Sequence, residues 1–567
     1  MKTKKIVSLA MASVLGASVL TAAGCNKKKI EGDNALEVYV CALGNGREWL
    51  DEALKVFAEK DEIKEKYPNF EYDVLANSEY NYGQEQIRSG VTTFDLLFTS
   101  QFSPATVEQQ LDGKSILEDL TDVYNGKIPD FNGGYEKNDD GEEWTYAEKM
   151  KKADPNRFAT IGFEQESNGE YETHYYYTLG GAGFYGILYN KDKMIEYGYL
   201  TEDSDGNVQG LPRTTEEMKA FAQKIKDGGH IPFIAAKDTG YWTRVQNLWW
   251  AQYEGAEAYD RYFQGQYKND EGEWERGVEV LSKAKGRYLA NAITESLLHY
   301  ENGFIHKESS ALPFTAAQTK LIQGDGLMQA NGAWFDQEMK DVASQEGADA
   351  EIRMMPSLII SEIVEVVPDD SIKGENEKTA DEELSALVRA LDVGSTALKG
   401  EGYEVTQKDF DRVKEAYNLY NPGEAFSPIA IPSYSDAKDL AKDFIRFMAT
   451  DEFARIYMEK TGGNSSAFYY DVESKDPALY ETFSGMQKDR LQYVKGKSSI
   501  LPYKTCNYPI VYRTGYADLG KGFELKYFSE NEKDRKPSKD CIDEQIAEYT
   551  RNNNEMWNTL LSQAGLK

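Results

Sequence analysis

The chain has 567 residues, too many for one hydrophobic core, which indicates two or three domains. Aromatic residues make up 12% of it, so the chain folds, and a net charge of −32 argues against binding to nucleic-acid phosphates. Four cysteines and four histidines exclude a disulfide scaffold and a zinc ribbon and leave little room for a histidine-rich metal site, so we expect no cofactor.

The N-terminus reads as a targeting segment. Three lysines, at positions 2, 4 and 5, precede an apolar run from Ile6 to Leu20 that is too short to span a membrane. Residues 21–25, Thr-Ala-Ala-Gly-Cys, then resemble a bacterial lipobox, with Ala22 where Leu is usual. We expect residues 1–24 to be a lipoprotein signal peptide, Cys25 to carry the lipid and residues 25–35 to form a tether. The alternative is an ordinary secretory signal with an incidental cysteine.

The remaining cysteines have different surroundings. Cys41 lies in an apolar strand, which predicts a buried thiol. Cys506 and Cys541 could pair in an extracellular compartment, but sequence spacing does not show whether they meet.

The segment after the tether alternates strands and helices. Apolar runs and helical spacing predict a strand at 36–43, a helix at 48–65, a strand at 70–75, a helix at 82–89 and a strand at 94–98. This order predicts a parallel sheet with right-handed crossovers. Ligands of such sheets bind at the carboxyl ends of the strands, here residues 44–48 and 99–103.

The pattern restarts after position 180. It predicts a strand at 184–189, a helix from Thr214 to Lys226, a strand at 231–236, a helical stretch at 241–263 and a strand at 326–330 that leads into a helix at Asn331-Gly332. Two α/β units predict two lobes with the chain crossing between them. Residues 360–425 fit this pattern poorly, because they contain an acidic run and then a helical stretch at 384–398, and we interpret them as an insertion.

Three other patterns suggest chemistry that their context does not support. The acidic loops at 135–144 and 267–274 lack the alternating ligands of a calcium loop and are typical of hairpin turns. The G-x-G-x-x-G at 181–186 leads into a predicted strand, so the helix N-terminus that binds phosphate in nucleotide-binding proteins is missing from this motif. Tyr175, Tyr176 and Tyr177 beside His174 could suggest a ferric-ion clamp, but a tyrosine-rich strand is the simpler interpretation.

An ordered set of motifs resembles family 1 of the extracellular solute-binding proteins, the carbohydrate-binding lipoproteins of ABC transporters. The motifs are the loop and helix at 44–57, the strand Phe-Asp-Leu-Leu-Phe at 94–98, Gly-Ile-Leu-Tyr-Asn-Lys-Asp-Lys-Met at 186–194, Met-Gln-Ala-Asn-Gly-Ala-Trp at 328–334, and the segments 430–433, 437–448 and 461–463. Residues 360–425 and 470–567 depart from the family pattern.

The resemblance implies an α/β fold, a two-lobe periplasmic-binding-protein-like type II clamp with hinge crossovers near 178–183, 355–358 and 450–461. The N-terminal lobe would contain 36–180 and about 355–455, including the insertion at about 360–425. The C-terminal lobe would contain 181–354 and about 456–567.

The same resemblance implies a non-catalytic, monomeric receptor that captures a carbohydrate and delivers it to an ABC permease from the outer face of the membrane. The chain length and the aromatic content favour an oligosaccharide. A lipid-anchored glycoside hydrolase, which would use two carboxylates across a sugar site, and a receptor for a non-sugar solute are the alternatives.

Sugars present apolar C–H faces, which aromatic rings cover, and hydroxyls, which planar polar groups satisfy. The resemblance places Trp334, Trp242 and Tyr241 as stacking residues of the second lobe, and Gly463 and Asn464 in a third contact loop.

The first lobe supplies further candidates at its strand ends. Asn45, Arg47 and Glu48 follow the first strand, although Arg47 could equally neutralise the acidic start of the helix. Ser100 and Gln101 end the third strand. Asp95 lies inside that apolar strand, where a carboxylate either hydrogen-bonds backbone groups or faces the ligand.

Overall fold

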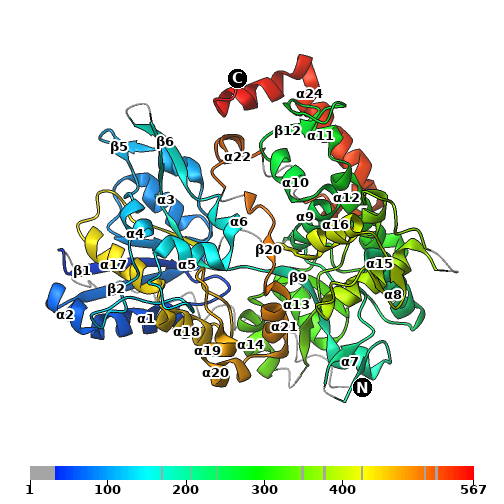
Figure 1. Cartoon of the computed structure of the whole chain (residues 1–567), viewed down its shortest axis with the longest axis horizontal. Helices are drawn as coiled ribbons and strands as arrows, with labels where there is room; N and C mark the ends of the chain where they lie inside the picture. Colours follow the sequence, from blue (N-terminus) through cyan, green and yellow to red (C-terminus); the bar gives the residue numbers. More distant parts are fainter. Residues whose placement is uncertain are drawn as a thin grey trace, which may run out of the picture.

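The computed structural model describes residues 32–167, 170–204, 206–238, 240–345, 350–374, 378–422, 426–503, 506–516 and 522–567 (Figure 1). The predicted signal peptide and Cys25 lie outside these residues. Within them, no helix combines the length and the apolar character needed to cross a membrane.

The first lobe is built on a five-stranded sheet in the order β2-β1-β3-β19-β8. β1 (Ala35–Cys41) pairs in parallel with β2 (Glu71–Asn77) and β3 (Leu96–Phe98), as the sequence predicts. β19 (Phe426–Ala430) joins β3 antiparallel and also pairs with β8 (Thr178–Gly181). The sheet therefore receives a strand from far along the chain.

Helix α1 (Glu48–Glu59) shows how the sequence forms this lobe. Its buried residues follow helical spacing and form one face, made of Trp49, Leu50, Ala53, Leu54 and Phe57. The predicted single helix to residue 65 breaks at Lys60, which is extended, and continues as α2 (Asp61–Lys66). α3 (Tyr82–Ser89), α17 (Lys438–Met448) and α18 (Asp451–Lys460) complete the main helices.

The second lobe has a smaller sheet in the order β14-β9-β15. β14 (Met328–Gly332) and β15 (Ile352–Met354) both pair antiparallel with β9 (Tyr185–Asn190). Residues 231–236 do not form the predicted strand. Within them only Phe233 makes β-bridges, which are isolated bridges to Ile305 and Met328. The main helices here are α8 (Thr215–Asp227), α9 (Tyr241–Glu254), α10 (Ala256–Tyr262), α12 (Lys285–Leu298), α13 (Phe314–Gln323) and α14 (Phe335–Gln345).

Within the described residues, both lobes also contain small two-stranded sheets, five of them antiparallel and one parallel. They are β4 (Gln110–Leu111) with β5 (Lys114–Ser115), β6 (Phe163–Ser167) with β7 (Glu170–His174), β10 (Thr201–Glu202) with β11 (Val208–Gln209), β12 (Gln266–Lys268) with β13 (Trp274–Arg276), β16 (Lys399–Gly400) with β17 (Tyr403–Glu404), and the parallel pair β18 (Leu419–Tyr420) with β20 (Ser498–Ser499).

The described residues 360–374 and 378–420 pack in the second lobe, which differs from the boundary expected from the sequence. Leu384 and Leu387 of α15 (Ala380–Asp392) and Phe410 of α16 (Gln407–Tyr417) join the core that contains Trp249. Arg213 also holds α15 through two hydrogen bonds to Asp392, of 2.7 and 2.6 Å. The second crossing therefore falls between residues 420 and 429, and not at 355–358.

The third crossing also lies later than expected. Phe453 and Tyr457 of α18, and Phe468 beyond it, pack in the core of the first lobe. Met486 of α21 (Gly485–Val494) is the next residue in a second-lobe core. The first-lobe part of this segment thus extends to about residue 468 instead of 455.

The C-terminal segment belongs to the second lobe. It contains α22 (Pro509–Thr514), α23 (Glu524–Tyr527) and α24 (Ser538–Gln563), and Trp557 of α24 is buried in the second-lobe core. Cys506 and Cys541 are both buried, unpaired thiols, so this structure does not contain the disulfide that the sequence left open. Cys41 is buried, as predicted.

Candidate functional site

Three aromatic side chains of the second lobe meet at the boundary with the first. Trp334 lies edge-on to Tyr185, with ring centres 5.0 Å apart, and to Tyr241, at 5.9 Å. Tyr185 and Tyr241 are 5.6 Å apart. We call these three residues the aromatic cluster. Edge-to-face rings at these separations attract each other and hold their faces in fixed directions.

A glycine shapes the turn that presents Trp334. β14 continues to Gly332 and α14 begins at Phe335, so Trp334 lies in the turn before the helix. The sequence had predicted a helix from Asn331-Gly332, which would have put Trp334 in the first helical turn. A Cβ atom on Gly332 would lie 2.1 Å from Cη2 of the Trp334 indole. Only glycine leaves room for the ring here, which gives a physical reason for the Asn-Gly-x-Trp pattern.

The first lobe covers this indole with its loop between β1 and α1. A Cβ atom on Gly44 would lie 3.5 Å from Cβ of Trp334, so the loop backbone approaches the indole closely. Trp334 is only 6% exposed as a result. Gly44 has φ of +74°, a conformation that favours glycine.

Two predicted amides of the first lobe also come together beside this loop. Asn464 Nδ2 donates to Asn45 Oδ1 at 2.8 Å, and Asn45 Nδ2 donates to Tyr457 Oη at 2.9 Å. All three side chains are buried. Neighbouring Gly463, with φ of +109°, accepts a hydrogen bond from Arg490 Nη2 at 2.6 Å. Burial lowers the pKa of Arg490 to about 10.

Arg47 and Glu48 are exposed at the start of α1. Arg47 donates from Nε and Nη2 to the two oxygens of Asp51, at 2.8 and 2.7 Å. This bond holds the pKa of Arg47 above its ordinary value. This ion pair matches the alternative that the sequence offered for Arg47, which is to neutralise the acidic first turn of α1.

Asp95 bonds inside the first lobe. Its Oδ2 accepts from the Glu37 backbone N–H at 2.8 Å and its Oδ1 from Ser435 Oγ at 2.6 Å. Burial raises its pKa although these bonds oppose the shift. Of the two roles that the sequence allowed, the structure shows the backbone-bonded one.

Ser100 and Gln101 follow β3 at the carboxyl edge of the sheet. Ser100 Oγ donates to the Tyr80 carbonyl, and Gln101 Nε2 donates to Asn81 Oδ1. These bonds join the loop after β3 to the loop after β2, and both polar side chains stay at the edge where a parallel sheet binds ligands.

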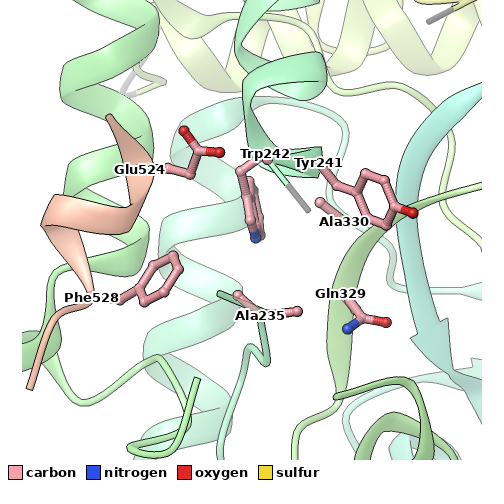
Figure 2. A pocket seen from close by; sticks show the side chains of 9 residues that line it. Ala235, Tyr241, Trp242, Gln329, Ala330, Glu524 and Phe528 are labelled. Atoms are coloured by element: carbon pink, nitrogen blue, oxygen red, sulfur yellow. The ribbon is translucent and has the colours of Figure 1, made fainter. Parts of the chain in front are cut away.

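Trp242 lies in the core of the second lobe, and it lines a small cavity together with Tyr241 of the aromatic cluster. It is 3% exposed and packs edge-on against Phe233 at 5.4 Å. Figure 2 shows its indole beside Ala235, Gln329 and Phe528, around a cavity of about 10 Å³. Trp242 and Tyr241 leave α9 in different directions, because neighbours on a helix point about 100° apart.

Sequence reasoning missed several residues here. Tyr185 completes the aromatic cluster, and the Arg244 guanidinium lies 5.7 Å from the centre of its ring. Arg244 follows Tyr241 by three positions, so helical spacing could have indicated a shared face. Glu524 is buried beside Trp242; its Oε2 accepts from Thr243 Oγ1 at 2.8 Å, and burial raises its pKa.

A polar contact also joins the lobes through the C-terminal segment. Arg513 Nε lies 3.1 Å from both oxygens of Glu108, and Tyr512 Oη donates to the same carboxylate at 2.8 Å. We call Glu108, Tyr512 and Arg513 the interlobe latch. Glu108 ends η2 (Pro104–Glu108) in the first lobe, and α22, which carries the other two, lies between the lobes in Figure 1. No sequence pattern indicated this pairing.

Among the described residues, no group of three or more His, Cys, Asp or Glu side chains is arranged to hold a metal ion.

No protein-family model and no curated protein matches the sequence. Solved structures do match the fold. The solute-binding protein RafE in complex with raffinose has a TM-score of 0.50 at 15% identity, over 92% of this chain and 99% of that chain. A chitin oligosaccharide binding protein has a TM-score of 0.52 at 13% identity, over 92% and 100%. Maltose-bound MalE3 of T. maritima has a TM-score of 0.50 at 14% identity, over 91% and 98%.

These matches define the class of fold. The chain has the two-lobe α/β fold of extracellular solute-binding proteins, which confirms the fold expected from the sequence motifs. At these identities the likeness concerns the fold alone.

Proposed function

We propose that this protein is an extracytoplasmic receptor that binds a carbohydrate between its lobes. The observation that carries the proposal is the aromatic cluster, which faces the Gly44–Asn45 loop across the lobe boundary. The fold is shared with a protein bound to raffinose, a chitin oligosaccharide binding protein and a protein bound to maltose, which supports the same ligand class.

The chemistry of this boundary suits a sugar. Trp334 and Tyr241 offer ring faces to apolar C–H groups, and such aromatic burial contributes about 0.5–1.5 kcal/mol beyond the area buried. The amides of Asn45 and Asn464 now pair with each other. A sugar hydroxyl, which both donates and accepts, can replace that partner without leaving either amide unsatisfied.

Lobe motion would admit the ligand. The chain crosses between the cores at three places: near 182–184, between the core residues Tyr420 and Ile429, and near 469–485. Hinge rotation about such segments separates the lobes and uncovers Trp334, and closure buries the bound sugar. Because closure removes apolar surface from water, ligand binding and closure favour each other.

We further propose that lipid on Cys25 holds the receptor at the outer face of the membrane and that the closed receptor delivers its sugar to an ABC permease. The lipobox-like segment supports the anchor. The fold class supports the transport role at the level of analogy.

Binding without catalysis is favoured over glycoside hydrolysis by the predicted ligand residues, and not by an absence of acids near the boundary, since the buried carboxyls of Asp336 and Glu338 follow Trp334 in α14. The predicted ligand residues that the structure brings together are Asn45, Asn464, Tyr241 and Trp334, and none is a carboxylic acid. A glycosidase needs two carboxyl groups that flank the scissile bond.

The test is a calorimetric screen of purified protein against raffinose, maltose and chitin oligosaccharides, with a peptide mixture as the non-sugar arm. We expect a sugar to bind and to be recovered intact after prolonged incubation. Released monosaccharide would favour the hydrolase, and binding of peptide alone would overturn the carbohydrate class.

A further inference from the structure

A second cavity, of about 860 Å³, lies between the lobes. First-lobe residues on its wall come from α5 (Tyr146–Ala153) and α6 (Pro155–Phe158), and second-lobe residues come from α21 and from 495–498. The first crossing, at 182–183, and residues 465–473, which lead from the first lobe into the third crossing, complete the wall. Figure 1 shows α6 and β20 between the two lobes, and Asn156 Nδ2 donates to the Ser499 carbonyl at 2.8 Å.

This cavity is distinct from the aromatic cluster. None of Asn45, Tyr185, Tyr241, Trp334 and Asn464 lines it. Its volume falls in the range of about 300–1,000 Å³ that is usual for small-molecule sites. We call it the hinge cavity.

The hinge cavity has the opposite charge from the protein as a whole. Its lining contains five basic residues and two acidic ones, in a chain whose net charge is −32. They are Lys152, Arg157, Arg490, Lys495 and Lys497 against Asp471 and Glu473. A local excess of positive charge in a concave wall attracts anions.

One of these cations has an unused donor. Arg157 is 2% exposed, its Nη1 donates to the Gly181 carbonyl at 3.3 Å, and its Nε–H has no hydrogen-bond acceptor. The nearest carboxylate, Asp154, lies 3.8 Å away and already accepts from Tyr420 Oη and Ser499 Oγ, both at 2.8 Å. A buried donor without an acceptor is costly, and a carboxylate is its strongest natural partner.

The same wall carries aromatic rings. Phe468, Tyr469, Tyr470, Tyr480 and Tyr420 line the cavity, and the rings of Tyr469 and Tyr470 are half-buried. The Lys152 ammonium lies 5.5 Å from the centre of the Tyr469 ring. This arrangement offers a ring face for apolar C–H groups next to a cation.

We propose that the hinge cavity is a second ligand site, for an acidic sugar of the hexuronate class, with its carboxylate toward Arg157 and its ring against Tyr469. A neutral sugar could pack against the Tyr469 ring but offers no charge to the Arg157 guanidinium. A small anion could pair with the guanidinium but has no apolar face for the tyrosine ring. Because both lobes line the cavity, a bound hexuronate would contact both lobes at once.

The test is calorimetry with D-galacturonate and D-glucuronate at millimolar concentration. The controls are the methyl ester of galacturonate, D-galactose and acetate, which remove the charge, the carboxylate and the ring in turn. We expect a hexuronate to bind at least about tenfold more tightly than any control. Failure of both hexuronates to bind, or equal binding of the ester, overturns the proposal.

Three variants keep the result independent of the proposed function. Tyr469→Ser at a half-buried position should weaken hexuronate binding by at least about tenfold, whereas Trp334→Ala should change it less than about twofold. Arg157→Lys, checked for a native melting profile, should also weaken it. Loss of hexuronate binding in Trp334→Ala with retention in Tyr469→Ser would overturn the hinge site. Hexuronate binding without any neutral-sugar binding would instead overturn the proposed function alone.

Discussion

The aromatic cluster and the interlobe latch join the same two lobes with different chemistry. Trp334 is 6% exposed and packs under the Gly44 loop, whereas Arg513 and Glu108 of the latch are 32% and 42% exposed. Buried apolar surface stabilises a contact at any ionic strength, but an exposed ion pair contributes little and is screened by salt. We therefore expect the aromatic cluster to determine ligand affinity and the latch to adjust how readily the lobes separate.

The largest expected effect is at the indole. Trp334→Ala should weaken sugar binding by more than about 1.4 kcal/mol, or tenfold, because it removes both the stacking face and the contact with the first lobe. Calorimetry against the sugar found in the screen measures it. Trp242→Phe is the matched control, since Trp242 lies in the core; it should lower the melting temperature and leave affinity unchanged. Equal affinities for wild type and Trp334→Ala would remove the indole from the site.

Gly332→Ala tests the turn without removing the indole. The added methyl would lie 2.1 Å from the ring, so the indole must move, and overpacking of this kind costs about 1–3 kcal/mol of unfolding free energy. The free energy of unfolding, measured by chemical denaturation, and the affinity for the sugar should both decrease. A variant as stable and as tight-binding as wild type would show that the indole position matters less than its presence.

A buried carboxyl two residues beyond the indole predicts pH-dependent stability. Burial raises the pKa of Asp336 to about 6, above its unfolded value of 3.8, and Ser484 Oγ donates to it. The folded state thus holds a proton that the unfolded state releases, so stability falls as the pH rises from about 4 to 6. Asp336→Asn should abolish this decrease, which amounts to about 2–3 kcal/mol for a pKa shift of this size. Denaturation at pH 4, 5 and 7 measures it, and an unchanged slope would contradict the assignment.

The smallest expected effect is at the latch. Glu108→Gln should cost less than about 1 kcal/mol and speed sugar release a few-fold at low salt, with no difference from wild type at 1 M salt. Stopped-flow release kinetics measure it. Arg47→Ala is the matched control, because it breaks an equally exposed Arg–carboxylate pair inside one helix and should leave release unchanged. Equal acceleration by both variants would show that the latch has no special role.

Local sequence patterns predicted many of the helices and strands of the first lobe. The apolar spacing of Trp49, Leu50 and Phe57 predicted α1, and the apolar runs predicted β1 and β3 close to their observed bounds. These elements follow from neighbouring residues, because the period of apolar residues shows which face is buried. Asn45 and Asn464 are hydrogen-bonded although 419 positions separate them. No local pattern relates the two residues, and only the family resemblance placed Asn464 in a ligand-contact loop.

The sequence by itself determined the two-lobe α/β class, the order of the first strands and helices, and the presence of Trp334 in an Asn-Gly-x-Trp turn. Tertiary structure alone decided that helices α15 and α16 pack in the second lobe, that Trp242 is a core residue while Tyr241 contacts Trp334 at the boundary, and that Arg513 reaches Glu108 across 405 positions. The physical reason is that hydrophobic periodicity specifies a buried face but not the surface that covers it, so which lobe receives each face depends on packing throughout the folded chain.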